Sequence, residues 1–91
     1  MGMYRKKPIV IEAIRLEGID TASLHPIATE FAKDEWGITV QPDPIRPCIH
    51  VKTLEGVMCC NVGDWLIRGI AGELYPCKAH IFETTYEEVA T

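Results

Sequence analysis

The sequence lacks any long apolar run, because stretches such as Pro8–Ile11 fall far short of the roughly 20 residues of a membrane-spanning helix. It also lacks a basic excess, since nine lysines and arginines against thirteen acidic residues give a net charge of −4. Nucleic-acid binding depends on a dominant basic surface, so this balance argues against a nucleic-acid partner. No secretion signal precedes the first strand-like run, and we expect a soluble, cytoplasmic chain that is not associated with a membrane.

The chain has four cysteines but no Cys-x-x-Cys pair of the kind that marks structural zinc sites. In a cytoplasmic chain these cysteines are expected to be free thiols. The nearest approach to a metal site combines Cys48-x-His50 with Cys77-x-x-His80, which together offer four nitrogen and sulfur ligands. Because Cys-x-His is an unusual spacing for zinc, we expect no metal and no cofactor, although the sequence leaves open whether these four residues ever bind an ion.

The first half of the chain predicts a strand, a helix and a second short strand. The run Ile9–Leu16 is rich in β-branched residues and predicts the first strand. The main helix is predicted from an apolar stripe with the spacing of one helical face, formed by Leu24, Ile27, Ala28 and Phe31. Pro26 is compatible with the first turn of this helix, and Gly37 ends it. Residues 38–41 then predict a short strand, followed by a stiff loop with three prolines.

The second half predicts β-structure. Cys48–Leu54 and Val57–Val62 flank Glu55-Gly56, which is typical of a hairpin turn. Pairing about that turn sets Thr53 opposite Met58 and Val51 opposite Cys60. One face of the hairpin is then apolar, with Ile49, Val51, Met58, Cys60 and Val62, and the other carries His50, Lys52, Cys59 and Asn61.

The remaining residues predict short elements, namely strands at Trp65–Arg68 and Leu74–Cys77, a helical turn at Ala79–Glu83 and a final strand at Thr84–Val89. Ninety-one residues are enough for one domain with one modest core. Residues 1–91 therefore predict a single α+β domain. We expect a small, mostly antiparallel, twisted sheet or partly open barrel with one main helix packed on it.

Both ends of the chain carry a distinctive set of motifs, which are Arg5-Lys6-Lys7-Pro8, Gly63-Asp64-Trp65, Tyr75-Pro76-Cys77 and Phe82-Glu83-x-Thr85-Tyr86. With these motifs the chain resembles a family of small phage and prophage proteins that has no assigned activity. The resemblance implies a phage or prophage origin and no known cofactor, and it supplies no catalytic residues. The family pattern also implies an aspartate near Lys78, where this chain has Ala79-His80, so the cap of the last helix is missing from its usual place.

Candidate catalytic groups are sparse. Cys59 lies beside His50 across the predicted hairpin, and a thiol next to a base is the minimal arrangement for nucleophilic catalysis. The pair would lie on a flat strand face, without the convergent polar groups of an active site. Asp64 follows Gly63 at the start of a strand, where a carboxylate commonly bonds nearby backbone. We therefore do not expect an enzyme.

The candidate binding residues are Arg68, Tyr75, Lys78 and Leu66. If Trp65 faces the core, Arg68 points outward beside Tyr75 and forms a cationic, aromatic surface. We expect a non-enzymatic protein-interaction module, a phage or prophage accessory protein that forms a homodimer through this surface or binds a host or phage protein. The alternative is a protein that binds an anionic metabolite or nucleotide, which requires Arg68, Tyr75 and Lys78 to converge on a concave pocket.

Overall fold

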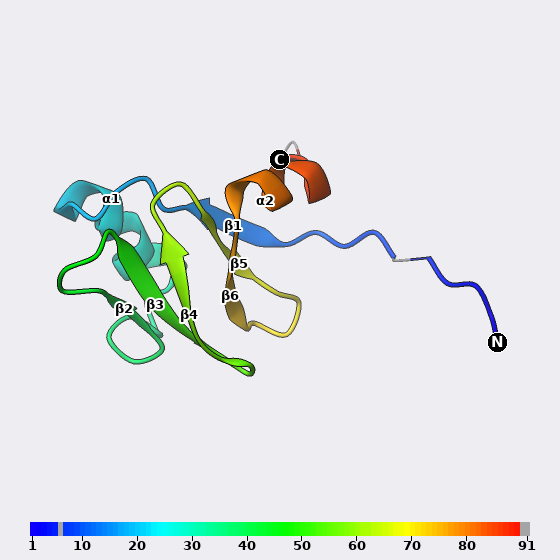
Figure 1. Cartoon of the computed structure of the whole chain (residues 1–91), viewed down its shortest axis with the longest axis horizontal. Helices are drawn as coiled ribbons and strands as arrows, with labels where there is room; N and C mark the ends of the chain where they lie inside the picture. Colours follow the sequence, from blue (N-terminus) through cyan, green and yellow to red (C-terminus); the bar gives the residue numbers. More distant parts are fainter. Residues whose placement is uncertain (6, 90–91) are drawn as a thin grey trace.

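The computed structural model describes residues 1–5 and 7–89, so Lys6 and the last two residues lie outside the described part. The strands form two antiparallel three-stranded sheets, with orders β1-β5-β6 and β2-β3-β4 (Figure 1). The strands are β1 (Glu12–Arg15), β2 (Val40–Pro42), β3 (Cys48–Thr53), β4 (Gly56–Asn61), β5 (Trp65–Arg68) and β6 (Leu74–Cys77). The helical segments are α1 (Thr21–Pro26), η1 (Ile27–Phe31) and α2 (Ala79–Thr85). The α+β class is confirmed, but the strands divide between two sheets where one sheet or a partly open barrel was predicted.

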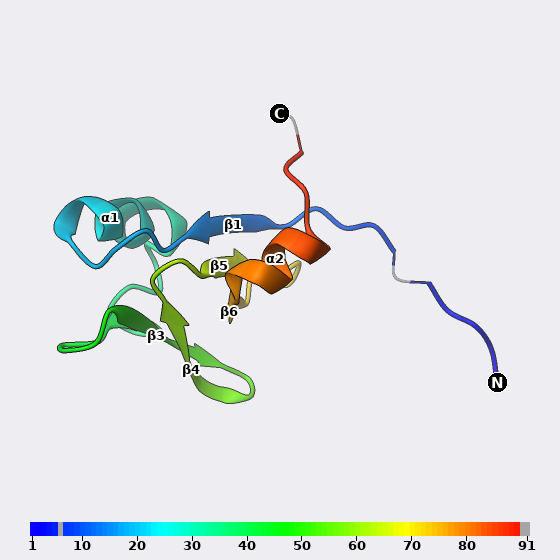
Figure 2. The same cartoon turned by 45° about the horizontal axis from the view of Figure 1, so that its top comes forward.

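The first strand is shorter than its apolar run predicted. β1 begins at Glu12, which pairs with Arg68, the last residue of β5. Residues before Glu12 therefore have no opposing strand in the first sheet. They continue as an extended arm that points away from the rest of the chain in two views (Figures 1 and 2).

The predicted main helix consists of two short segments. Pro26 is the sixth residue of α1, beyond the first turn, where it offers no amide hydrogen and its ring crowds the carbonyl four residues earlier. The chain continues as the π-helical turn η1, in which the amide of Ala32 donates to the carbonyl of Ile27 at 2.8 Å. The predicted stripe still faces inward, since Ile27 is fully buried and Leu24 and Phe31 pack against the core.

The β3–β4 hairpin forms with its turn two residues tighter than predicted. Val51 lies opposite Met58, and Thr53 lies opposite Gly56. The Thr53 hydroxyl donates to the Gly56 carbonyl at 2.7 Å and accepts from the Glu55 amide at 3.1 Å, which stabilises the tight turn. Because the shift is an even number of residues, each side chain keeps its predicted face.

The C-terminal part differs more from its prediction. The helical turn extends over all of α2, and no strand follows, so the predicted strand Thr84–Val89 is wrong. Asp64 supplies the cap of α2 that the family pattern places near Lys78. Its Oδ1 accepts a hydrogen bond from the Ala79 amide at 3.2 Å. The Phe82 ring stacks on Trp65 with centroids 4.1 Å apart, which holds α2 against the first sheet. Within the described residues, no helix has the length and apolar character needed to cross a membrane.

The two sheets and the helical segments enclose one main core. Its fully or almost fully buried members are Leu16, Ile27, Ala32, Val40, Ile49, Val51, Cys60, Leu66 and Leu74. Ile67 is also fully buried, but on the opposite face of β5, because successive side chains of a strand alternate. It shares that face with Trp65, which stacks on α2. Val51 and Cys60 are therefore buried together as predicted, whereas Ile67 belongs to a second, smaller apolar layer.

Arg68 joins the first sheet to the helical segment. Its Nη1 donates to Glu35 Oε1 and to the Gly72 carbonyl, both at 3.0 Å, and its Nη2 donates to the Phe31 carbonyl at 2.6 Å. Its guanidinium carbon also lies 5.6 Å from the centroid of the Phe31 ring. The bond to Phe31 lies at the carbonyl end of η1, where the last backbone carbonyls lack amide donors within the helix.

We predict that Ile67→Ala lowers the free energy of unfolding by about 2–4 kcal/mol, because it leaves a cavity in a fully buried site. The matched control is Ile70→Ala in the exposed turn after β5, which should change stability by less than about 0.5 kcal/mol. Urea unfolding of both variants measures the difference. Equal effects would show that Ile67 does not pack as described.

We predict that Arg68→Met destabilises the protein by about 1.5–3 kcal/mol, since hydrogen bonds to a charged group are lost while the apolar stem is kept. Lys33→Met removes an exposed cation nearby and should have almost no effect. Thermal and urea unfolding provide the comparison. An Arg68→Met variant as stable as the wild type would contradict the role of Arg68 as a link between β5 and η1.

Candidate functional site

The predicted binding residues do not form one surface. Leu66 is fully buried in the main core, so the predicted docking surface around it is wrong. The reason is that β5 is the central strand of its sheet and is covered on both faces. Arg68 also points toward η1, where its donors are already used, and it does not point outward as predicted.

Tyr75 and Lys78 lie apart from Arg68. Tyr75 is the partner of Ile67 and Arg68 is the partner of Leu74, so Tyr75 and Arg68 point to opposite faces of the sheet. Burial, followed by a hydrogen bond with Tyr86, raises the pKa of Tyr75 to about 12. Lys78 is exposed at the N-cap position of α2. The predicted cationic, aromatic patch is therefore not formed.

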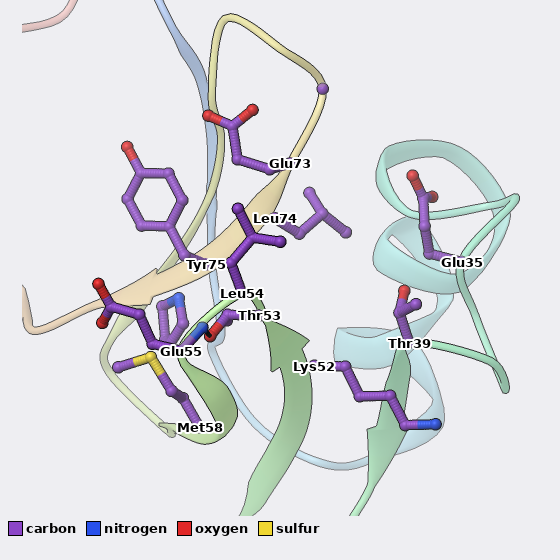
Figure 3. A pocket seen from close by; sticks show the side chains of 12 residues that line it. Glu35, Thr39, Lys52, Thr53, Leu54, Glu55, Met58, Glu73, Leu74 and Tyr75 are labelled. Atoms are coloured by element: carbon purple, nitrogen blue, oxygen red, sulfur yellow. Dashed lines mark hydrogen bonds between the residues drawn. The ribbon is translucent and has the colours of Figure 1, made fainter.

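A groove of about 650 Å³ lies between the tip of the β3–β4 hairpin, β6 and the segment before β2 (Figure 3). Its charged lining residues are Glu35, Glu55, Glu73 and Lys52. Three carboxylates against one ammonium group disfavour an anionic ligand. Neither Arg68 nor Lys78 lines this groove, so it does not provide the convergent site that the small-anion alternative requires.

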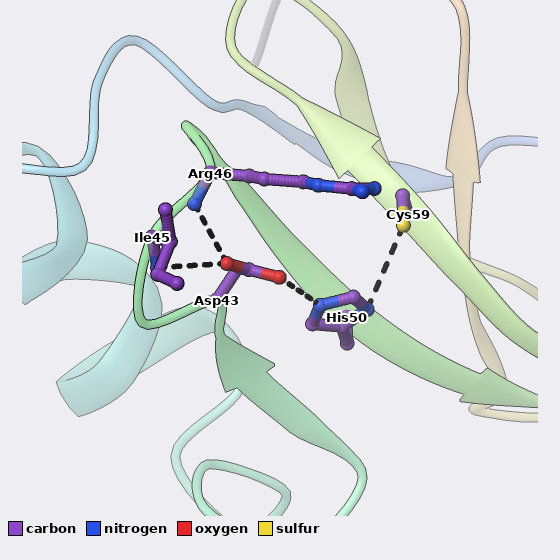
Figure 4. Close-up of polar contacts among 5 residues, drawn as sticks. All are labelled: Asp43, Ile45, Arg46, His50 and Cys59. Atoms are coloured by element: carbon purple, nitrogen blue, oxygen red, sulfur yellow. Dashed lines mark hydrogen bonds and ion pairs between the residues drawn. The ribbon is translucent and has the colours of Figure 1, made fainter.

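A cluster of nitrogen and sulfur ligands lies on the other face of the hairpin. Cys48 and His50 are on β3, and Cys59 on β4 is the direct partner of His50. Their ligand atoms all lie within 4.8 Å of one another, and no other group of three such residues is found among residues 1–5 and 7–89. The Cys59 thiol donates to His50 Nδ1 at 3.6 Å (Figure 4). We call these three residues the Cys–His cluster.

Asp43 in the proline-rich loop fixes the orientation of His50. Its Oδ2 lies 2.7 Å from His50 Nε2, while its Oδ1 accepts from the amides of Ile45 and Arg46 at 2.8 and 2.7 Å (Figure 4). The Arg46 amide, the His50 ring and the Ile45 amide together hold the pKa of the Asp43 carboxyl far below its usual range. The carboxylate is thus charged and held by three donors, and it keeps the proton on Nε2 of the imidazole.

The two cysteines outside this cluster differ in burial, because Cys60 lies in the main core and Cys77 is only partly buried. Burial raises the pKa of Cys60 to about 12 and also raises that of Cys77. Cys77 lies on β6 in the other sheet, so it does not join Cys48 and His50 as the four-ligand combination with His80 required. Sequence reasoning found the neighbours Cys59 and His50 but missed Asp43, for which the Asp-x-x-Arg turn in the proline-rich loop was the only signal.

The N-terminal arm, residues 1–5 and 7–11, carries several exposed apolar side chains close together in the sequence. Met3 and Tyr4 are almost fully exposed, and Ile9 and Val10 are also exposed. β1, which continues the arm, is an edge strand with one row of backbone groups facing away from β5. Exposed apolar side chains next to an open strand edge are typical of surfaces that pair with another chain.

Comparison of the chain with protein-family models, with curated proteins and with solved structures found no significant match. The resemblance to small phage and prophage proteins therefore stays a prediction that depends on the motifs alone.

Proposed function

We propose that the chain is a non-enzymatic protein-interaction module, a phage or prophage accessory protein whose N-terminal arm pairs with a second copy of the chain. The observation that carries this proposal is the projection of an apolar, β-branched arm from an edge strand (Figure 2). The docking surface thus lies at the N-terminus and not around Leu66, Arg68 and Tyr75.

The sequence of the arm favours a paired strand. Ile9, Val10 and Ile11 are β-branched, and such residues are stabilised when they pack against a neighbouring strand. In the single chain Val10 stays 76% exposed because β5 ends opposite Glu12. A second chain running alongside β1 and the arm would bury these side chains and satisfy the open backbone edge.

Charge complementarity supports a second copy as the partner. The first seven residues hold three of the nine basic residues of the chain and no acidic residue. All thirteen acidic residues are therefore in the remainder, which has only six basic residues. A basic arm and an acidic body attract each other between two identical chains, and a two-fold arrangement allows both arms to dock at once.

The arm is long enough for such an exchange. A stretch of eleven residues, the length of sequence before Glu12, can reach about 35–40 Å when fully extended. The described chain measures 30 and 24 Å along its two shorter axes, so the arm of one copy can cross the body of the other. When both arms dock, the dimer buries twice the apolar area that one docked arm buries. This additional burial would stabilise a chain that has only one modest core.

We predict that light scattering at micromolar concentration gives twice the 10.2 kDa of one chain. Val10→Asp should shift the protein to the monomer, because it places a charge in the paired strand without touching the core. Ile38→Asp is the matched control at a site 63% exposed, outside the arm, and should stay dimeric. High salt should weaken the dimer, since part of the attraction is between exposed charges.

A wild-type chain that stays at the mass of one copy at all concentrations would contradict self-association. A dimer that Val10→Asp leaves intact would instead show that another surface makes the contact. Circular dichroism of both variants establishes that the monomeric form is still folded.

A further inference from the structure

The spacing of the Cys–His cluster matches a tetrahedral metal site. A zinc ion with bonds of about 2.3 Å to sulfur and 2.0–2.1 Å to nitrogen holds these two atoms about 3.6 Å apart. The observed distance between His50 Nδ1 and Cys59 Sγ is 3.6 Å. The Cys48 sulfur lies within 4.8 Å of both atoms, so a small side-chain rotation brings all three to bonding distance.

The imidazole of His50 presents the correct nitrogen to the sulfurs. Asp43 accepts a hydrogen bond from the Nε2–H group of His50. The proton stays on Nε2, and the lone pair of Nδ1 is directed at Cys59. Metal-bound histidines in proteins characteristically donate their second nitrogen to a carboxylate in this way. Asp43 is itself fixed by two backbone amides, so the ring is oriented before any ion arrives.

The surroundings favour an ion over a substrate. Cys48 is 2% exposed and closes the inner side of the cluster, whereas Cys59 is exposed and leaves an access route from solvent. Neither of the two described cavities is lined by these residues, so neither would hold a substrate against the Cys59 thiol. Two thiols and one imidazole are ligands for a borderline-soft divalent cation.

We propose that Cys48, His50 and Cys59 bind one zinc-class divalent cation, with Asp43 as the outer partner of His50. On binding, the two thiols release their protons to the solvent, and two thiolates balance the charge of the ion. Solvent supplies the fourth ligand on the exposed side. The ion links the proline-rich loop, through Asp43 and His50, to both strands of the β3–β4 hairpin. This site is independent of the N-terminal arm.

The test is titration of the reduced full-length protein with Co²⁺, which gives thiolate charge-transfer and tetrahedral absorption bands when bound by Cys and His. We expect saturation at one ion per chain, loss of the bands when Zn²⁺ is added, and a higher melting temperature with either ion. Cys59→Ser, at an exposed position, should abolish the charge-transfer band or weaken it strongly. Cys77→Ser removes a thiol outside the cluster and should bind as the wild type does.

Asp43→Asn provides the second arm of the test. It should weaken the affinity about 10–100-fold without changing the ligand set, as is typical for outer-shell partners of metal-bound histidine. The proposal is overturned if the reduced protein gives no cobalt bands, or if Cys59→Ser and Cys77→Ser bind equally. A Cys48–Cys59 disulfide that persists under reducing conditions would also overturn it.

Discussion

The position of β5 between β1 and β6 is the constraint on which the rest of the structure depends. Leu66 is buried in the main core on one face of this strand, and Ile67 is buried on the other. Arg68, the next residue, binds the end of η1. With Trp65, which stacks on Phe82 of α2, the four residues of β5 therefore join the second sheet, the helical segment and the C-terminal helix. This is an economical arrangement for a chain that can bury only one modest core.

The same constraint decides where the chain remains open. Because β5 ends at Arg68, the apolar run before Glu12 has no partner and becomes the arm. Because β5 is covered on both faces, its side chains are unavailable for recognition. Among the strand edges, that of β1 combines open backbone groups with the exposed apolar side chains of the adjoining arm.

The second sheet carries the thiol and imidazole groups of the Cys–His cluster. Its tight hairpin turn sets His50 directly opposite Cys59, and the proline-rich loop folds back so that Asp43 reaches the far side of the same imidazole. The rigid loop limits the freedom of Asp43 before any ligand is present, which lowers the entropic cost of ordering the site. Both sheets supply residues to the main core, and the second sheet also carries a polar face with two thiols and a histidine.

The sequence by itself determined the α+β class, the hairpin faces and the inward stripe of the helical segment, because alternation and helical spacing are local properties. It did not determine the pairing partners of the strands or the end of β5, since these depend on contacts between distant residues. The prediction that Leu66 and Arg68 lie on an exposed surface was wrong for that reason, because the exposed face of a strand is known only when the strands and helices packed against it are known. Asp64 as the cap of α2 and Asp43 as the partner of His50 were likewise decided only by the folded structure, because each contact depends on how the intervening loop turns back, over 15 and 7 residues respectively.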